Sequence, residues 1–284
     1  MHYLLLLLLL NSNGIKTDCN KYNKILKSEK SEKIYFRRYK DTYIVTGFGS
    51  QNNPAFFAKE KEHNQVKFQF SFKYYLISNL WFGFTQKSVW DIWDIDRSSP
   101  FQDTNYNPEL FYELKSSSVL GIDYLKSFKV GIEHESNGKS KDTKMSRSWN
   151  RIYSQVYLDV FKYLKIDFKL WVTFDLLIRS LNIVDNSLFE NNDIGEYYGN
   201  FKLKIITPIN KNLNIQIALQ KGNSLDITKG QIELGVDFRI PVTYLKDKGI
   251  NPRFYLQLFS GYGETLLNYN KQQLKYRVGF MFPY

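Results

Sequence analysis

The segment from residue 231 to residue 240 reads QIELGVDFRI and decides the fold, because apolar and non-apolar residues alternate along its whole length. Successive side chains of a β-strand point to opposite faces, so this alternation predicts a strand with one apolar and one polar face. The segments 66–74 (VKFQFSFKY) and 212–220 (NLNIQIALQ) repeat the pattern. The chain is therefore predicted to be all-β.

Twelve segments are predicted to be strands: 41–49, 66–77, 80–92, 106–116, 126–136, 146–160, 163–175, 196–208, 212–222, 230–241, 252–264 and 274–284. Their spacing is wider than the roughly 8–12 residues between turns of a soluble sandwich, and it suits strands of about 10 residues tilted across a bilayer. The last segment alternates and ends on an aromatic residue, as bacterial outer-membrane barrels commonly do. The predicted architecture is a twelve-stranded antiparallel transmembrane β-barrel, and a soluble β-sandwich or lipocalin-like barrel is the alternative.

The composition excludes several classes of protein. The chain has 284 residues, a single cysteine and three histidines, which argues against a disulfide scaffold and against a Cys- or His-rich metal centre. The net charge of +11 comes from lysines that are spread over strands and loops without a clustered basic motif, so nucleic acid is not an expected partner. The longest apolar run, residues 3–10, is far shorter than the ~20 residues of a membrane helix.

The N-terminal part of the chain differs from the rest. Residues 4–10 are seven leucines that resemble the apolar region of a secretory signal peptide, although no Lys or Arg precedes them. We therefore expect a leader at 1–19, a polar lead-in at 20–40 and a barrel domain at 41–284. Cys19 follows Lys16-Thr17-Asp18, which is not the small, apolar context of a lipidated cysteine, so a free thiol is the better interpretation.

The lengths of the connections predict the orientation of the barrel. Counted from the N-terminus, the even connections are mostly short, whereas several odd ones are longer: 91–105, 137–145, 177–195 and 265–273. Short turns of outer-membrane barrels face the periplasm and longer loops face outward. The odd connections are therefore expected on the side of the cell exterior.

Polar residues with catalytic chemistry lie on the apolar side of one predicted hairpin. Residues two apart in a strand share a face, so His134 and Ser136 lie with Val130 and Ile132, whereas the glutamates between them point into the barrel. Asn150 occupies the same face of the next strand. A serine hydroxyl needs an adjacent base to become a nucleophile, and a third group orients that base. A lipid-facing set of this kind suits the ester bond of a phospholipid; the alternative is an ordinary pair of surface residues.

The same hairpin resembles that of a known family. The segments 131–140 (GIEHESNGKS) and 146–153 (SRSWNRIY) are closely similar to the active-site hairpin of outer-membrane phospholipase A. Four further segments carry the likeness, which covers roughly residues 65–284: 85–90 (TQKSVW), 98–101 (SSPF), 104–111 (TNYNPELF) and 260–266 (SGYGETL).

The resemblance implies a twelve-stranded barrel of the bacterial outer membrane that hydrolyses the sn-1 and sn-2 acyl esters of phospholipids. It implies that Ser136 is the nucleophile, that His134 is the general base and that Asn150 orients the base. The backbone N–H of Gly138 would lie in the oxyanion hole. The enzyme would use calcium and would be active as a homodimer.

The resemblance also implies where calcium binds and where the subunits meet. The Lys139 carbonyl and the Ser146 hydroxyl of one subunit would bind calcium together with Ser98 of the other. Glu190 corresponds to a carboxylate at a further calcium site, and Gln86 to a polar residue of the dimer contact. The alternatives are a passive pore that keeps the scaffold, against which the complete His-Ser-Asn set argues, and a secreted soluble esterase, which would lack lipid-facing apolar bands.

Overall fold

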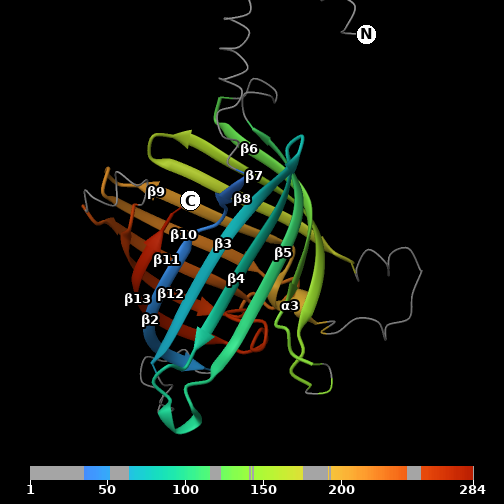
Figure 1. Cartoon of the computed structure of the whole chain (residues 1–284), viewed down its shortest axis with the longest axis vertical. Coiled ribbons are helices and arrows are strands. Elements are labelled where there is room, and N and C mark those ends of the chain that lie inside the picture. The colour runs from blue at the N-terminus through green and yellow to red at the C-terminus, as the bar shows by residue number, and fades with distance from the viewer. Residues whose placement is uncertain are drawn as a thin grey trace, which may run out of the picture. The chain divides into compact units, whose positions relative to one another are not determined.

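Twelve antiparallel strands form a closed ring in the computed structural model. They are β2 (Thr42–Gln51), β3 (Gln65–Ile77), β4 (Leu80–Trp90), β5 (Phe101–Lys115), β6 (Leu125–Ser136), β7 (Ser148–Phe161), β8 (Leu164–Thr173), β9 (Phe201–Pro208), β10 (Leu213–Lys221), β11 (Gly230–Arg239), β12 (Arg253–Gly261) and β13 (Gln273–Phe282). Each strand pairs with its neighbours in sequence, and β13 pairs with β2 from Phe282↔Thr42 to Gln273↔Gln51, which closes the ring (Figure 1).

The structure describes residues 35–51, 64–115, 123–140, 142, 144–174, 191, 193–241 and 251–283. The chain divides into two units, 1–35 and Phe36–Tyr284, and the barrel belongs to the second. Within this part of the chain, no helix is long and apolar enough to span a membrane.

All twelve predicted strands are present, and two boundaries need correction. The strand predicted from 106 begins at Phe101, because the polar Asp103 and Asn105 continue the inward row instead of ending the strand. The strand predicted for 196–208 begins at Phe201, because a short helix, α3 (Ile194–Tyr198), precedes it and ends at Gly199 with a φ of +65°.

Besides α3, two elements were not predicted. The short strand β1 (Phe36–Arg38) pairs with β3, from Phe36↔Tyr74 to Arg38↔Phe72. The 3-10 helix η1 (Ile95–Arg97) lies in the connection from β4 to β5, where Asp94 accepts a hydrogen bond from the Arg97 backbone N–H at 3.2 Å.

The wall of the barrel has an apolar exterior and a charged interior. On β6, Val130 and Ile132 are exposed, whereas the next residue, Glu133, is buried. The same pattern of exposed apolar and buried polar residues holds on β12, where Phe254 and Leu256 are exposed and Gln257 is buried. A soluble protein would bury the apolar row; a barrel in lipid presents it to the bilayer and keeps polar groups inside, where they pair with one another.

One end of the barrel carries the odd connections. The β3–β4 turn (Ser78–Asn79) and the β4–β5 connection lie at opposite ends (Figure 1). The β12–β13 connection folds over the interior, since Leu266 is fully buried. Its backbone N–H groups at 266 and 267 donate to Asn105 Oδ1 at 3.1 Å and to Asp103 Oδ2 at 2.9 Å. The inward polar residues of β5 thus hold this loop against the barrel end next to the β6–β7 connection.

Candidate active site

The outer face of the β6–β7 hairpin brings the predicted catalytic residues together. His134 lies directly opposite Asn150, and Ser136 lies opposite Ser148, in the antiparallel register. His134 Nδ1 and Asn150 Oδ1 are hydrogen-bonded at 2.8 Å. The neighbouring outward residue on the same strand as Asn150 is the exposed Ile152.

This hydrogen bond selects one tautomer of the neutral imidazole. An amide oxygen can only accept, so Nδ1 carries the hydrogen, and in the neutral ring the lone pair is then on Nε2. A neutral ring in this tautomer is ready to accept a proton at Nε2. Ser136 shares the outward face two residues along β6, and among the described residues its hydroxyl makes no hydrogen bond. Contacts between nucleophile and base often tighten only when substrate is bound.

Charged side chains support the hairpin from inside. The Arg151 guanidinium donates to Glu135 Oε2 at 2.7 Å and forms an ion pair with Glu133 at 2.9 Å (Nε to Oε1), a contact without hydrogen-bond alignment. Trp149 Nε1 also donates to Glu135 Oε2, at 3.0 Å. These inward residues flank His134 and Asn150 in sequence, so they link β6 to β7 on the opposite side of the same backbone.

A neighbouring strand joins this support. Asn107 Nδ2 on β5 donates to the His134 carbonyl at 2.9 Å, and Lys169 Nζ on β8 contacts Glu133 Oε2 at 2.8 Å. Four consecutive strands, β5 to β8, are therefore tied together at the level of the site.

The loop from 137 to 147 is organised by Asn137, whose side chain is buried. Its Oδ1 accepts from the N–H of Arg147 at 2.9 Å and from the N–H of Lys139 at 3.4 Å. Its Nδ2 donates to the Met145 carbonyl at 2.9 Å. One side chain thus holds both limbs of the loop.

Gly138 follows Asn137 in the left-handed region, with a φ of +63°. Only glycine adopts this conformation without steric cost. A Cβ atom at this position would also lie 3.1 Å from the ring of Tyr106, which stands opposite Ser136 on β5. The chain can therefore place the Gly138 N–H next to the strand end that carries Ser136, in a backbone conformation that would be strained for other residues.

The predicted calcium ligands lie on two connections. Lys139 and Ser146 are on the two limbs of the loop that Asn137 crosslinks. Ser98 ends η1 on the β4–β5 connection, with a φ of +63°, and is exposed. Backbone carbonyls and hydroxyls are the hard oxygen donors that Ca²⁺ prefers, so the donor set of these residues fits the ion. Glu190 lies outside the described residues.

The predicted dimer residue Gln86 lies on the same outward row as Ser136. The register runs from Phe70 to Gln86, then to Tyr106, Ser136 and Ser148 across five neighbouring strands. Strands are about 4.8 Å apart, so Gln86 lies roughly 10 Å from Ser136 on this face. A surface that covers Gln86 would also approach the site.

Comparison with known proteins gives a family for this arrangement. The family model described as phospholipase A1 matches residues 20–282. The chain belongs to the phospholipase A1 family. It is 33% identical over 236 residues to phospholipase A1 of Escherichia coli K12, covering 79% of this chain and 71% of that protein. It is 32% identical over 259 residues to phospholipase A1 of Klebsiella pneumoniae, covering 86% and 80%.

Solved structures agree with the phospholipase A1 assignment. Outer membrane phospholipase A from E. coli superposes with a TM-score of 0.71 at 28% identity, covering 89% of this chain and 93% of that one. The enzyme from Salmonella typhi, solved as a dimer with bound calcium, gives 0.70 at 28% identity, covering 89% and 94%. The predicted family, the twelve-stranded outer-membrane barrel and the class of lipolytic hydrolase are thereby confirmed.

Sequence reasoning missed the residues that support the site. Asn137 stood inside the quoted motif without a role, although a buried asparagine beside a glycine is a common organiser of loops. Glu133 and Glu135 were only expected to point into the barrel, and Arg151 was given no role at the site. Alternation gives the face of a residue, but which inward side chains pair with one another depends on the register, and that had to come from the structure.

Proposed function

We propose that this member of the phospholipase A1 family is a calcium-dependent hydrolase of the sn-1 and sn-2 acyl esters of phospholipids, activated when two copies pair in the outer membrane. The observation that carries the proposal is the 2.8 Å hydrogen bond from His134 Nδ1 to Asn150 Oδ1 on the outward, apolar face of the barrel. A base oriented towards lipid can act on an ester that never leaves the bilayer. In support, a solved variant of the E. coli enzyme is described as an active-site mutant in which an asparagine is changed to alanine.

In the proposed mechanism, His134 Nε2 removes the proton of the Ser136 hydroxyl as its oxygen attacks the ester carbonyl. The Gly138 N–H donates to the oxyanion of the tetrahedral intermediate. His134 then gives its proton to the leaving glycerol oxygen, and an acyl-serine remains. Water attacks this acyl-serine with the same base, which releases the fatty acid. Asn150 keeps the imidazole in the required tautomer without a carboxylate beside the bilayer, where a charge is costly.

Calcium would be held by the Lys139 carbonyl and Ser146 of one subunit with Ser98 of the partner copy, and it would supply positive charge close to the oxyanion. Two protein ligands from one subunit are fewer than the 6–8 oxygens that Ca²⁺ takes, which leaves room for a ligand from a second copy and for water. This supports dimerisation through the face that carries Gln86. The S. typhi enzyme was solved as a dimer with bound calcium, which supports this proposal.

We also propose that residues 1–19 act as an export leader and 20–40 as a polar lead-in to a barrel domain at 41–284. The family model begins to match at residue 20, directly after the proposed leader.

The test is fatty-acid release from phospholipid by the refolded chain in detergent micelles, with calcium or with a chelator, beside Ser136→Ala. Release that requires both calcium and Ser136 supports the whole proposal. Release that requires Ser136 and is unaffected by the chelator supports the proposed triad and contradicts the proposed calcium ligands. Equal release from wild type and Ser136→Ala, in preparations shown to be folded and dimeric, would contradict the hydrolase mechanism and favour a structural barrel.

A further inference from the structure

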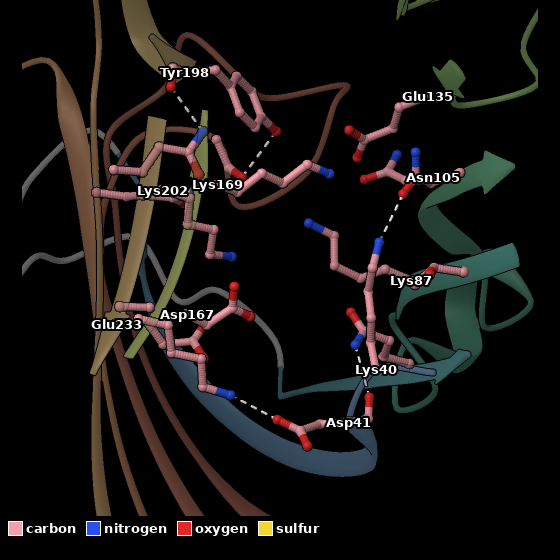
Figure 2. Close-up of a pocket in the computed structure, with 18 of the residues that line it drawn as sticks. Lys40, Asp41, Lys87, Asn105, Glu135, Asp167, Lys169, Tyr198, Lys202 and Glu233 are labelled. Atoms are coloured by element: carbon pink, nitrogen blue, oxygen red, sulfur yellow. Dashed lines mark hydrogen bonds and ion pairs between the residues drawn. The ribbon is translucent and has the colours of Figure 1, made fainter. Parts of the chain in front are cut away.

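The barrel encloses a cavity of about 270 Å³ between its walls (Figure 2). Strands from all around the ring contribute to its lining, and eight of the lining side chains are cationic against six that are acidic. The cavity is large enough for several water-sized groups and therefore for a small polyatomic ion. Inside the barrel Coulomb interactions are stronger than in bulk water, so the position of each charge relative to its partners matters.

Six of the eight cations have an acidic partner. The ion pairs are Lys40–Glu109, Lys67–Glu264, Lys129–Glu113, Arg151 with Glu133 and Glu135, Lys169–Glu133 and Lys204–Asp41. These pairs account for most of the interior charge and belong to the framework of the barrel.

Lys87 on β4 and Lys202 on β9 differ from the other six. Within the part of the chain that the structure describes, neither has an ion pair or a hydrogen bond, and both side chains point into the cavity from opposite walls (Figure 2). Lys202 is exposed and Lys87 half-buried, since their ammonium groups face the enclosed space.

The strand register explains why these two lysines lack partners. Lys87 stands between Gln69 and Asn105 on the neighbouring strands, and Lys202 stands between Gln220 and Lys169. No acidic residue is therefore directly opposite either lysine. A lysine needs an acceptor, and two of the three amide oxygens are used elsewhere: Asn105 Oδ1 accepts from the Leu266 N–H at 3.1 Å and Gln220 Oε1 from Gln231 Nε2 at 2.7 Å.

We propose that this cavity binds a small, multiply charged oxyanion of the phosphate class between Lys87 and Lys202. Each ammonium has three donors and no acceptor, so a tetrahedral oxyanion can accept charge-assisted hydrogen bonds from both walls. Binding would give both ammonium groups a direct partner and link β4 to β9 across the barrel. Asp167 and Glu233 also line the cavity; they are hydrogen-bonded to Gln155 at 2.6 Å and to the Tyr255 hydroxyl at 3.3 Å. The site is inside the barrel and does not depend on the proposed hydrolase mechanism.

The test uses the full chain refolded in a detergent without phosphate groups, with a chelator present so that calcium phosphate cannot form. Sodium phosphate is titrated against sodium chloride at constant ionic strength while thermal unfolding is followed by circular dichroism. We expect a saturable rise of the unfolding midpoint, roughly 5 °C at a phosphate concentration 100 times Kd. Equilibrium dialysis with radiolabelled phosphate should give one ion per chain.

Lys87→Met and Lys202→Met should each weaken phosphate binding by tenfold or more. Lys211→Met is the matched control, because Lys211 is exposed in the β9–β10 turn and its loss removes one charge without touching the cavity. If a methionine variant does not refold, Lys202→Gln keeps a polar group at the site and serves instead.

Three probes separate the sources of the oxyanion. Sulfate that binds like phosphate indicates a site for any divalent oxyanion, and glycerol 3-phosphate that binds as tightly as phosphate indicates that phosphomonoesters also enter. Binding of phosphate alone indicates the free ion. The proposal is overturned if no saturable binding occurs, or if both lysine variants bind as the wild type does; the lysines would then balance Asp167 and Glu233 through the interior.

Discussion

Glu135 and Arg151 are joined at 2.7 Å directly behind the hydrogen bond between His134 and Asn150. The four residues occupy neighbouring positions on β6 and β7, two facing outward and two facing inward. Both ion-pair side chains are largely buried: that of Arg151 is 8% exposed and that of Glu135 is 14% exposed. The hydrogen bond between His134 and Asn150 needs β6 and β7 to keep a fixed register and twist. The ion pair between Glu135 and Arg151 holds the two strands in that register and twist next to the site.

We predict that Glu135→Gln lowers stability and disturbs the catalytic geometry. The variant leaves Arg151 with Glu133 as its remaining acidic partner, so the loss in unfolding free energy should be about 2 kcal/mol, below the 3–5 kcal/mol for a buried charge that loses its only partner. Urea unfolding measures the stability, and kcat at saturating lipid measures the geometry. A double-mutant cycle with Arg151→Met should show a coupling energy of about 1 kcal/mol or more; additive losses would mean that the pair does not act as a unit.

A second prediction concerns Asn150. Asn150→Ala removes the acceptor that fixes the His134 tautomer, so kcat should fall by an order of magnitude or more while the barrel folds normally. Asn150→Asp keeps an acceptor oxygen and should retain more activity than the alanine variant. Fatty-acid release from mixed micelles at saturating calcium checks both. Equal activity of Asn150→Ala and wild type would remove this residue from the mechanism.

The strands were predictable because the two faces of the barrel wall have different surroundings. Lipid outside and charged groups inside impose a period of two on every strand, and this period locates all twelve. His134, Ser136 and Asn150 could be placed on one outward face by the same alternation. Their proximity was expected because β6 and β7 are consecutive strands joined as a hairpin.

The remaining features depend on the register and on loop geometry, which a period of two does not contain. The last three residues of α3 were assigned to the strand predicted for 196–208, because the five residues of this helix, IGEYY, are too few to show a helical period. The extension of β5 to Phe101 was missed because Gln102 and Thr104, which alternate with the inward Asp103 and Asn105, are polar and show no apolar row. The interior ion pairs could not be assigned from sequence, since many Lys and Glu residues have equivalent inward positions.

A third prediction concerns the loop that carries the proposed calcium ligands. Asn137→Ala removes three hydrogen bonds, two of which join the loop's two limbs, so the calcium concentration for half-maximal activity should rise by tenfold or more. Asn137→Asp keeps the oxygen that accepts from Lys139 and Arg147 and loses only the donor to Met145, so its rise should be smaller. Activity is titrated with calcium at fixed lipid. If both variants lose kcat with an unchanged calcium requirement, the loop orients the oxyanion hole and does not set calcium affinity.

The last prediction concerns Glu264, a buried carboxylate in the β12–β13 connection near the site. Burial acts to raise the pKa of Glu264, but Arg277 and Lys67 outweigh it and lower the pKa from its usual 4.5 to about 2. The ion pairs measure 2.8 Å to Arg277 and 3.0 Å to Lys67. Because the pKa is lower in the folded state, the carboxylate stabilises the fold fully above pH 4.5, and this contribution is lost as the pH falls from 4.5 towards 2.

Glu264→Gln should therefore cost on the order of 3 kcal/mol of unfolding free energy at pH 7. The difference from wild type should shrink steadily below pH 4.5, because protonation of Glu264 then makes the two proteins alike in charge. Urea midpoints at pH 7, 5, 4 and 3 measure this, and the difference between the two proteins removes the contribution of all other acids. A difference that stays constant down to pH 3 would show that the loop is held by its backbone contacts to Asp103 and Asn105, with the charge of Glu264 making no net contribution.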